Sequence, residues 1–136
     1  MKFLLRSGPL IAIVDASALF AVADKRDLRH ADCTRALTES RGQLVVPTLV
    51  IAEATYLVAS RLGPVAEAKF LRHVSELEIE PPTHAEWGRT ADLVAEYADL
   101  GLGGADASIV ALAERLSATT IITLDDRAYS IQRAGF

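Results

Sequence analysis

Apolar residues cluster in short runs along the chain, and polar segments with a different spacing separate these runs. Unbroken apolar runs bounded by turn residues are typical of strands buried inside a parallel sheet. The run at 10–14 is the clearest, and a second strand is expected at 119–123. A short strand at 44–46 and a weak one at 77–80, ended by two prolines, complete the set.

The segments between these runs carry apolar residues at three- and four-residue spacing, which predicts helices. Ser17 is expected to cap the first of them. The expected ranges are 17–23, 28–40, 47–63, 64–74 and 105–116.

One more helix is expected before the glycine-rich stretch 101–104. Thr83 and Glu86 have the spacing of a capping box, in which each side chain bonds the other residue's backbone N–H. The stripe expected to face the core consists of Trp87, Ala91, Val94 and Ala98.

Strands alternate with helices throughout, which predicts one α/β domain over 1–136 with a mostly parallel central sheet. Residues 1–8 are expected to form an irregular lead-in. The chain has 136 residues, of which 51% are apolar, enough for a substantial core. We find no internal repeat or linker.

The cysteine content and the N-terminus bear on the compartment. Cys33 is the single cysteine, so no internal disulfide forms and a reducing cytoplasm is expected. The basic and apolar N-terminus imitates a secretion signal, but Asp15 interrupts it, and no uncharged run is long enough to span a bilayer. His30 and Cys33 have half the spacing of a zinc motif, and without a second half a structural role is favoured.

Three carboxylates stand alone within otherwise uncharged stretches, namely Asp15, Glu53 and Asp106, and Asp125 is the first charge after Arg115. An ionised carboxylate removed from water without compensation costs several kcal/mol. Two of these acids follow predicted strands and two lie in the opening turns of predicted helices, so all four belong to the same edge of a parallel sheet. Glu53 and Asp106 are expected to point inward. A site built only from carboxylate oxygens favours Mg²⁺ or Mn²⁺.

Each acid also has a simpler explanation. A strand-end aspartate such as Asp15 also occurs as a phosphorylated residue or a ribose-binding group. Asp106 suits a helix N-terminus, Asp125 suits a turn, and Asp126 competes with it as the fourth ligand. The nearby hydroxyl residues are read first as caps and strand ends, with a hydrogen bond to a metal-binding carboxylate as the alternative. They are Ser17, Ser108 and Thr123.

Four segments, taken together, resemble the PIN domain family in its branch of VapC-like toxins from toxin–antitoxin pairs. They span nearly the whole chain in the family's order and spacing. The segments are VDASAL at 14–19, VPTLVIAEATYL at 46–57, GGADASIVALAERL at 103–116 and TTIITLDDRAYS at 119–130.

The resemblance implies a three-layer α/β/α fold and an RNA-cleaving site in which Mg²⁺ or Mn²⁺ is held by Asp15, Glu53, Asp106 and Asp125. It implies that Ser17 and Thr123 support that site. A VapB-like antitoxin and a homodimer are the implied partners. The sequence departs from the family pattern at Asp126, Tyr129 and the long N-terminal lead-in.

The net charge of −4 is unusual for an enzyme that binds phosphate groups. Setting the four proposed ligands aside leaves 14 of the 18 acids, which equals the 14 Lys and Arg. Six basic residues are candidates to line a substrate groove, although solvated helix faces explain them as well: Arg26, Arg29, Arg61, Lys69, Arg72 and Arg127. A non-catalytic module that binds RNA or antitoxin is the second hypothesis.

Overall fold

The computed structural model describes residues 2–4, 10–40 and 42–124. Asp125, Asp126 and Arg127 lie outside the described residues, as does Tyr129.

The described strands form one five-stranded sheet in the order β1-β5-β2-β3-β4. The pairs β5–β2, β2–β3 and β3–β4 are parallel, whereas β1 is antiparallel to β5. The mostly parallel sheet predicted from the sequence is confirmed. The strand bounds are β1 Lys2–Leu4, β2 Ile11–Val14, β3 Gln43–Pro47, β4 Ile79–Glu80 and β5 Thr120–Ile122.

The prediction of an irregular lead-in is wrong for residues 2–4, which form β1 at the edge of the sheet. The sequence signal was poor because the segment KFL has only three residues. Its pairing depends on the distant β5, which local patterns do not reveal.

The predicted helices are all present, with ends shifted by one or two residues. Gly63 ends α3 with φ +89°, a conformation that favours glycine, and Pro64 then starts α4 at a position where no N–H is needed. The bounds are α1 Ala16–Ala23, α2 His30–Thr38, α3 Thr48–Leu62, α4 Pro64–Val74, α5 His84–Glu96 and α6 Gly104–Leu116, with a 3₁₀ turn η1 at Ala98–Leu100.

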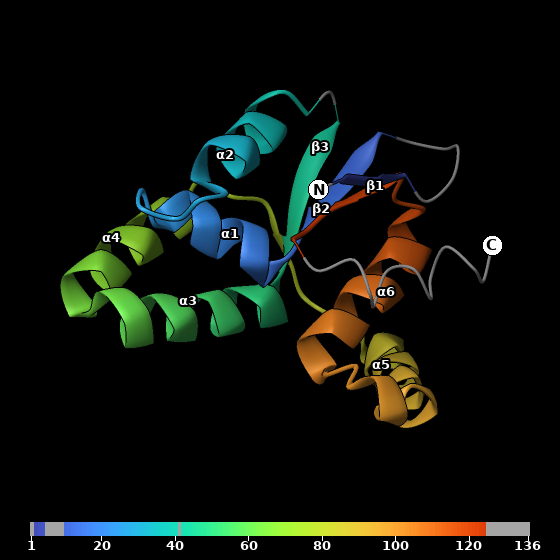
Figure 1. Ribbon diagram of the computed structural model, residues 1–136. Coiled ribbons are helices and arrows are strands. Elements are labelled where there is room, and N and C mark those ends of the chain that lie inside the picture. Colours follow the sequence, from blue (N-terminus) through green and yellow to red (C-terminus); the bar gives the residue numbers. More distant parts are fainter. Residues whose placement is uncertain (1, 5–9, 41, 125–136) are drawn as a thin grey trace.

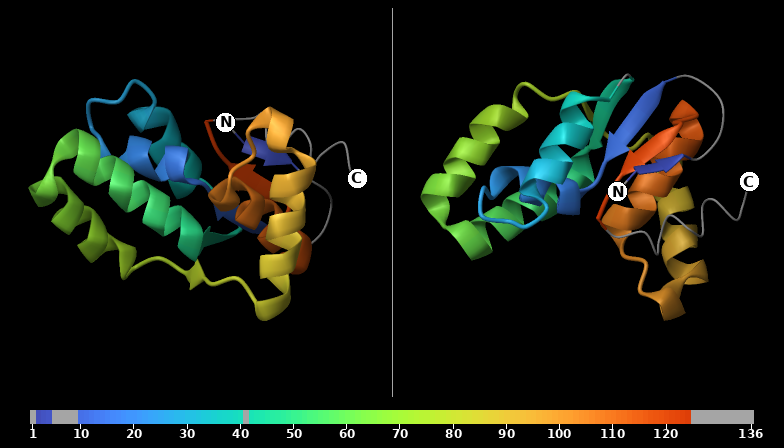
Figure 2. Two further views of the ribbon diagram at one scale, coloured as in Figure 1. Left: turned by 90° about the horizontal axis from the view of Figure 1, so that it is seen from below. Right: turned by 45° about the horizontal axis from the view of Figure 1, so that its top comes forward.

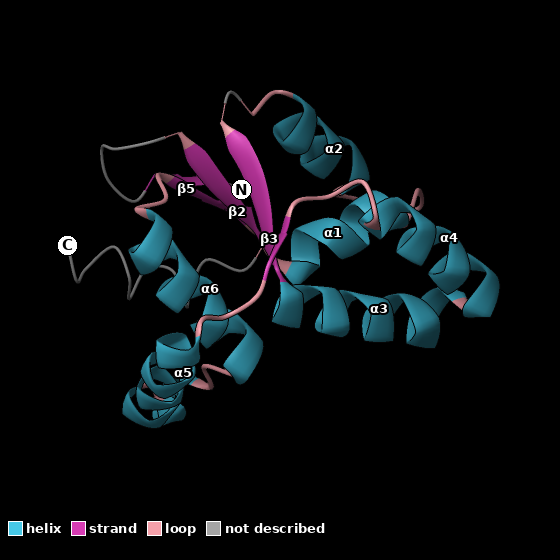
Figure 3. Ribbon diagram, turned by 180° about the vertical axis from the view of Figure 1, so that it is seen from behind, coloured by secondary structure: helices cyan, strands magenta, loops and turns pink. Residues whose placement is uncertain are grey.

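The helices lie on both sides of the sheet and make a three-layer α/β/α fold. In Figure 1, α1 and α2 lie on one side of β2 and β3, and α6 with α5 lies on the other. Figure 2 and the rear view of Figure 3 show the same division, with α3 and α4 extending away on the side of α1. Because α1, α3 and α6 all start near the carboxyl ends of the parallel strands, their first turns meet at one edge.

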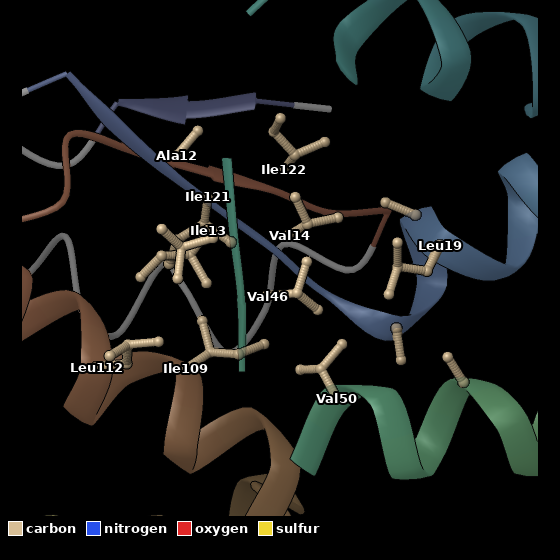
Figure 4. Packing of buried hydrophobic residues seen from close by; sticks show 14 of the residues in the cluster. Ala12, Ile13, Val14, Leu19, Val46, Val50, Ile109, Leu112, Ile121 and Ile122 are labelled. Carbon is tan, nitrogen blue, oxygen red and sulfur yellow. The ribbon is translucent and has the colours of Figure 1, made fainter. Parts of the chain in front are cut away.

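The core lies between the sheet and these helices. Ile13 and Ile121 from the sheet and Ile109 from α6 are completely buried. Val46 on β3 and Val50 on α3 continue the apolar contact toward α1, as Figure 4 shows. This packing fixes the starts of α1, α3 and α6 relative to the strand ends. No helix among the described residues has both the length and the apolar character to cross a membrane.

Helix α5 differs from the prediction in which face it buries. Trp87 is 51% exposed, whereas Glu86, Thr90 and Leu93 are buried. The capping box of Thr83 and Glu86 is present as predicted. The predicted stripe is wrong at Trp87, Ala91 and Ala98, which are exposed, and right at Val94, which packs against the core. Glu86 is instead directed toward α6, where its carboxylate receives a hydrogen bond from Arg115.

Candidate metal centre

Asp15 lies directly after β2 and is the N-cap of α1. Its Oδ1 accepts hydrogen bonds from the Ala18 N–H at 3.1 Å and from the Ser17 hydroxyl at 2.6 Å. The expectation that Ser17 caps α1 is therefore wrong: the longer Asp15 side chain takes that position, and Ser17 bonds the cap itself. The sequence alone did not show which of these two residues caps α1, because Ser and Asp are equally good N-caps.

Thr123 connects β5 to the same carboxylate. The Thr123 hydroxyl donates to Asp15 Oδ2, and the Leu124 N–H donates to Ser17 Oγ at 3.0 Å. Thr123 is 1% exposed and Asp15 is 4% exposed, so these groups bond one another in an environment with little water. The hydrogen bonds that the sequence offered as an alternative role for Ser17 and Thr123 are thus present.

The protonation of Asp15 reflects two opposing effects. Burial raises the pKa of its carboxyl group above the ordinary value, because the charged form loses its hydration. The hydrogen bonds from Ser17, Thr123 and Ala18 oppose this rise, since they stabilise the carboxylate. Burial is the larger effect, so the site disfavours an isolated negative charge at Asp15.

Glu53 lies in the second turn of α3 and is exposed to solvent, which contradicts the expectation that it points inward. The residues of α3 that face the core are instead Val50, Ala54 and Val58. Partial desolvation raises the pKa of the Glu53 carboxyl group, and the negative charges of Asp106 and Asp15 raise it further. The carboxylate thus lies at the open margin of the site, within electrostatic reach of the other two acids.

Asp106 lies in the first turn of α6 and is half-buried. The helix-terminus explanation accounts for its position, and its charge contributes to the raised pKa of Glu53. The neighbouring Ser108 donates to the carbonyl of Ala105 at 2.6 Å. Ser108 therefore bonds within the first turns of α6 and is not its cap, a position that Gly103 occupies.

The donor chemistry fits a hard divalent cation, because the site offers carboxylate oxygens from different elements and the charges of two acids contribute to raising the pKa of the third. The described residues alone do not form a complete coordination site for such a cation. Within the described ranges, no group of three or more His, Cys, Asp or Glu side chains is arranged to hold a metal ion. The proposed fourth acid, Asp125, and its competitor Asp126 fall outside those ranges.

The zinc-like spacing of His30 and Cys33 is structural, as expected. His30 Nδ1 donates to the carbonyl of Ala21 at 2.8 Å and so connects α2 to α1. Cys33 is completely buried within the core.

Two backbone donors of the site were not predicted from the sequence. The N–H of Ala18 bonds Asp15, and a helix start after the strand was the available signal for it. The N–H of Leu124 bonds Ser17 across 107 positions, and no local pattern indicates such a contact.

Comparison with known proteins agrees with this fold. The family model of the PIN domain matches residues 12–134. Ribonuclease VapC26 of Mycobacterium tuberculosis is 40% identical over 123 residues, which cover 89% of this chain and 91% of the relative.

Solved structures share the fold at low identity. VapC20 of M. tuberculosis, described as a toxin that cleaves the sarcin-ricin loop, has a TM-score of 0.80 at 18% identity, covering 92% of this chain and 95% of that one. VapBC2 of Rickettsia felis, bound to a promoter DNA fragment, has a TM-score of 0.66 at 18% identity, covering 89% and 92%. By the match over residues 12–134 and the 40% identity, the chain belongs to the PIN domain family and is similar to its VapC ribonucleases.

Proposed function

We propose that this chain is a metal-dependent endoribonuclease that acts as the toxin of a toxin–antitoxin pair. The observation that carries the proposal is the grouping of Asp15, Glu53 and Asp106 at one sheet edge, where two of the acids raise the pKa of the third. The 40% identity to a protein named as a ribonuclease supports RNA as the substrate.

The proposed metal ligands are Asp15, Glu53 and Asp106, with Asp125 as the fourth and Asp126 as its substitute. Bound Mg²⁺ or Mn²⁺ supplies Lewis acidity, which acidifies water and stabilises charge on the phosphoryl oxygens of RNA. Without a cation, the raised pKa values of Asp15 and Glu53 disfavour their ionised forms, which a bound divalent cation would favour.

The protein's own groups have separate tasks in this proposal. Thr123 and Ser17 fix both oxygens of Asp15, so that this carboxylate keeps one orientation during turnover. Glu53 is the carboxylate open to solvent, and it therefore suits the role of accepting the proton of the attacking water better than buried Asp15. Asp106, at the N-terminus of α6, completes the acidic face.

A VapB-like antitoxin is the proposed partner, with one of its segments covering the acidic groove. Related folds are described as toxin–antitoxin complexes, for example one from Klebsiella pneumoniae with a TM-score of 0.68 at 19% identity, covering 88% of this chain and 90% of that one. We also propose a homodimer in the cytoplasm. Exposed apolar residues on α3 and α4 favour this pairing: Tyr56, Val65 and Leu71.

Cleavage of structured RNA by the purified protein tests this function. The proposal expects cleavage with Mg²⁺ or Mn²⁺, no cleavage after chelation, and none by Asp106→Asn. Cleavage that persists after both treatments would contradict it.

A non-catalytic module that binds RNA or antitoxin is the second candidate. The incomplete metal geometry of the described residues favours it, as does the engagement of both Asp15 oxygens in hydrogen bonds. RNA binding without cleavage at any metal concentration is the result that would support this candidate over the first.

A further inference from the structure

Helix α3 carries a basic residue, Arg61, about two turns after the acidic residue Glu53. Glu53 and Arg61 are eight positions apart, and Leu57 lies midway. Residues spaced by four are neighbours on a helix surface, so these three form a line that winds by about 80° around α3 from Glu53 to Arg61. Eight residues correspond to about 12 Å along the helix axis.

Two features relate the ends of this line to α1. At its start, the pKa of Glu53 is raised by desolvation and by the charges of Asp106 and of Asp15, the N-cap of α1. At its end, the Arg61 guanidinium carbon lies 5.1 Å from the centroid of the Phe20 ring on α1. Both ends of the line therefore border α1, which packs alongside α3 (Figure 1).

The contact with Phe20 restrains a side chain that is otherwise free to move. Phe20 is 7% exposed and belongs to the core, so its ring is a fixed platform. Arg61 is exposed, and among the described residues it takes part in no salt bridge. A guanidinium stacked on an aromatic face keeps its N–H donors directed outward, and such donors bind phosphate oxygens in pairs.

We propose that Arg61 is a positioning residue that binds a backbone phosphate of the RNA, a few nucleotides from the phosphate at the acidic site. The inference rests on the proposed function. It assigns the path of the substrate: one strand runs along the border of α1 and α3, from Glu53 past Leu57 to Arg61. Among the described basic residues considered for a groove, Arg61 is the one that an aromatic contact holds against α1, the helix that Asp15 caps.

The test measures RNA cleavage and RNA binding for the parent, Arg61→Ala and Arg61→Lys. Arg61→Ala is expected to raise KM about tenfold with little change in kcat, because a charge-assisted bond to the RNA is lost away from the reacting atoms. It is also expected to reduce the slope of log K against log salt by about one. Arg61→Lys keeps the positive charge but loses the planar group that lies over Phe20. Its KM is therefore expected to lie between those of the parent and of Arg61→Ala.

Two further variants make the test specific. Phe20→Leu removes the ring while Arg61 remains, and it is expected to raise KM in the same direction by a smaller factor. Arg89→Ala removes one charge from α5, where Arg89 pairs with Glu114, and is expected to leave KM and the salt slope near those of the parent. Circular dichroism of each variant establishes that it is folded.

Each outcome decides the inference. An active parent together with an Arg61→Ala variant of unchanged KM and salt slope would overturn the role of Arg61 and leave the proposed function intact. Equal effects of Arg61→Ala and Arg89→Ala on KM and on the salt slope would show that only the net charge of the protein matters. This result would also overturn the role of Arg61. A parent that neither binds nor cleaves RNA would overturn both the function and the inference.

Discussion

The hydroxyl of Thr123 donates a hydrogen bond to Oδ2 of Asp15, although the two residues are 108 positions apart. Thr123 follows β5 and Asp15 follows β2, and these strands are parallel neighbours in the sheet. The bond therefore connects two strand ends at the edge where the acidic residues meet.

Thr123→Val removes this bond while keeping the shape of the side chain. The buried Asp15 oxygen loses a donor, so the free energy of unfolding should fall by about 1–3 kcal/mol. Affinity for Mn²⁺ should fall roughly 10–100-fold, because the carboxylate loses its orientation. Urea unfolding and manganese titration measure the two effects. Thr123→Ser, which keeps the hydroxyl, is the control, and equal losses in both variants would contradict this role.

Glu53→Gln tests the electrostatic grouping of the acids. The pKa values of Asp15 and Glu53 are raised in the folded protein, so their contribution to stability is present at acidic pH. This contribution to stability is lost as the pH rises from about 4, the ordinary pKa of a carboxyl group, through the raised pKa values of the folded protein. Without metal, Glu53→Gln should therefore be more stable than the parent at pH 7, by a few tenths of a kcal/mol because the exposed charge is screened by solvent.

Urea unfolding in a chelating buffer between pH 4 and pH 8 checks this prediction. Glu76→Gln, an exposed residue away from the acidic edge, is the matched control and should follow the parent. Curves for the parent and Glu53→Gln that stay parallel over the whole range would show that neither desolvation nor the neighbouring acids raise the pKa of Glu53.

Most of the fold was predictable because the strong signals are local. The apolar run before Asp15 and the proline and glycine boundaries of α3 and α4 each specify an element without reference to distant residues. The face of α5 was not predictable in the same way. Its buried Glu86 is compensated by Arg115, which is 29 positions away, and apolar spacing alone assigned the buried face to Trp87.

The residues of the candidate site could be predicted from the sequence, but the burial of each side chain could not. An acid isolated in an apolar run indicated Asp15, and the structure buries it. The same argument predicted that Glu53 is buried, yet its side chain is exposed on α3. Periodicity assigns a helix face, whereas the depth of a residue on that face depends on how neighbouring helices pack.

The ion pairs of α6 allow a test of the packing of α5. Glu86 is 7% exposed and bonded to Arg115, whereas Arg89 and Glu114 pair at the surface. Arg115→Met leaves a buried carboxylate without its cation and should lower the free energy of unfolding by about 2–3 kcal/mol. Arg89→Met should cost less than about 1 kcal/mol. Urea unfolding measures both, and equal costs would contradict the burial of Glu86.

Ser17→Ala tests the second hydrogen-bond chain at Asp15. Ser17 donates to Oδ1 of Asp15 and accepts from the Leu124 N–H, so the variant loses two bonds at once. The free energy of unfolding should fall by about 1–2 kcal/mol. Ser17→Thr keeps the hydroxyl and should retain most of the stability. A fully stable Ser17→Ala variant would show that water replaces the hydroxyl at no cost.

The most direct test of the acidic site is a manganese titration that follows metal binding and single-turnover RNA cleavage in the same samples. The proposed function predicts that both rise with the same midpoint in the parent, and that Asp106→Asn, folded by circular dichroism, loses both. Cleavage at full rate in a chelating buffer, or metal binding by the parent with no cleavage of any structured RNA, would contradict it.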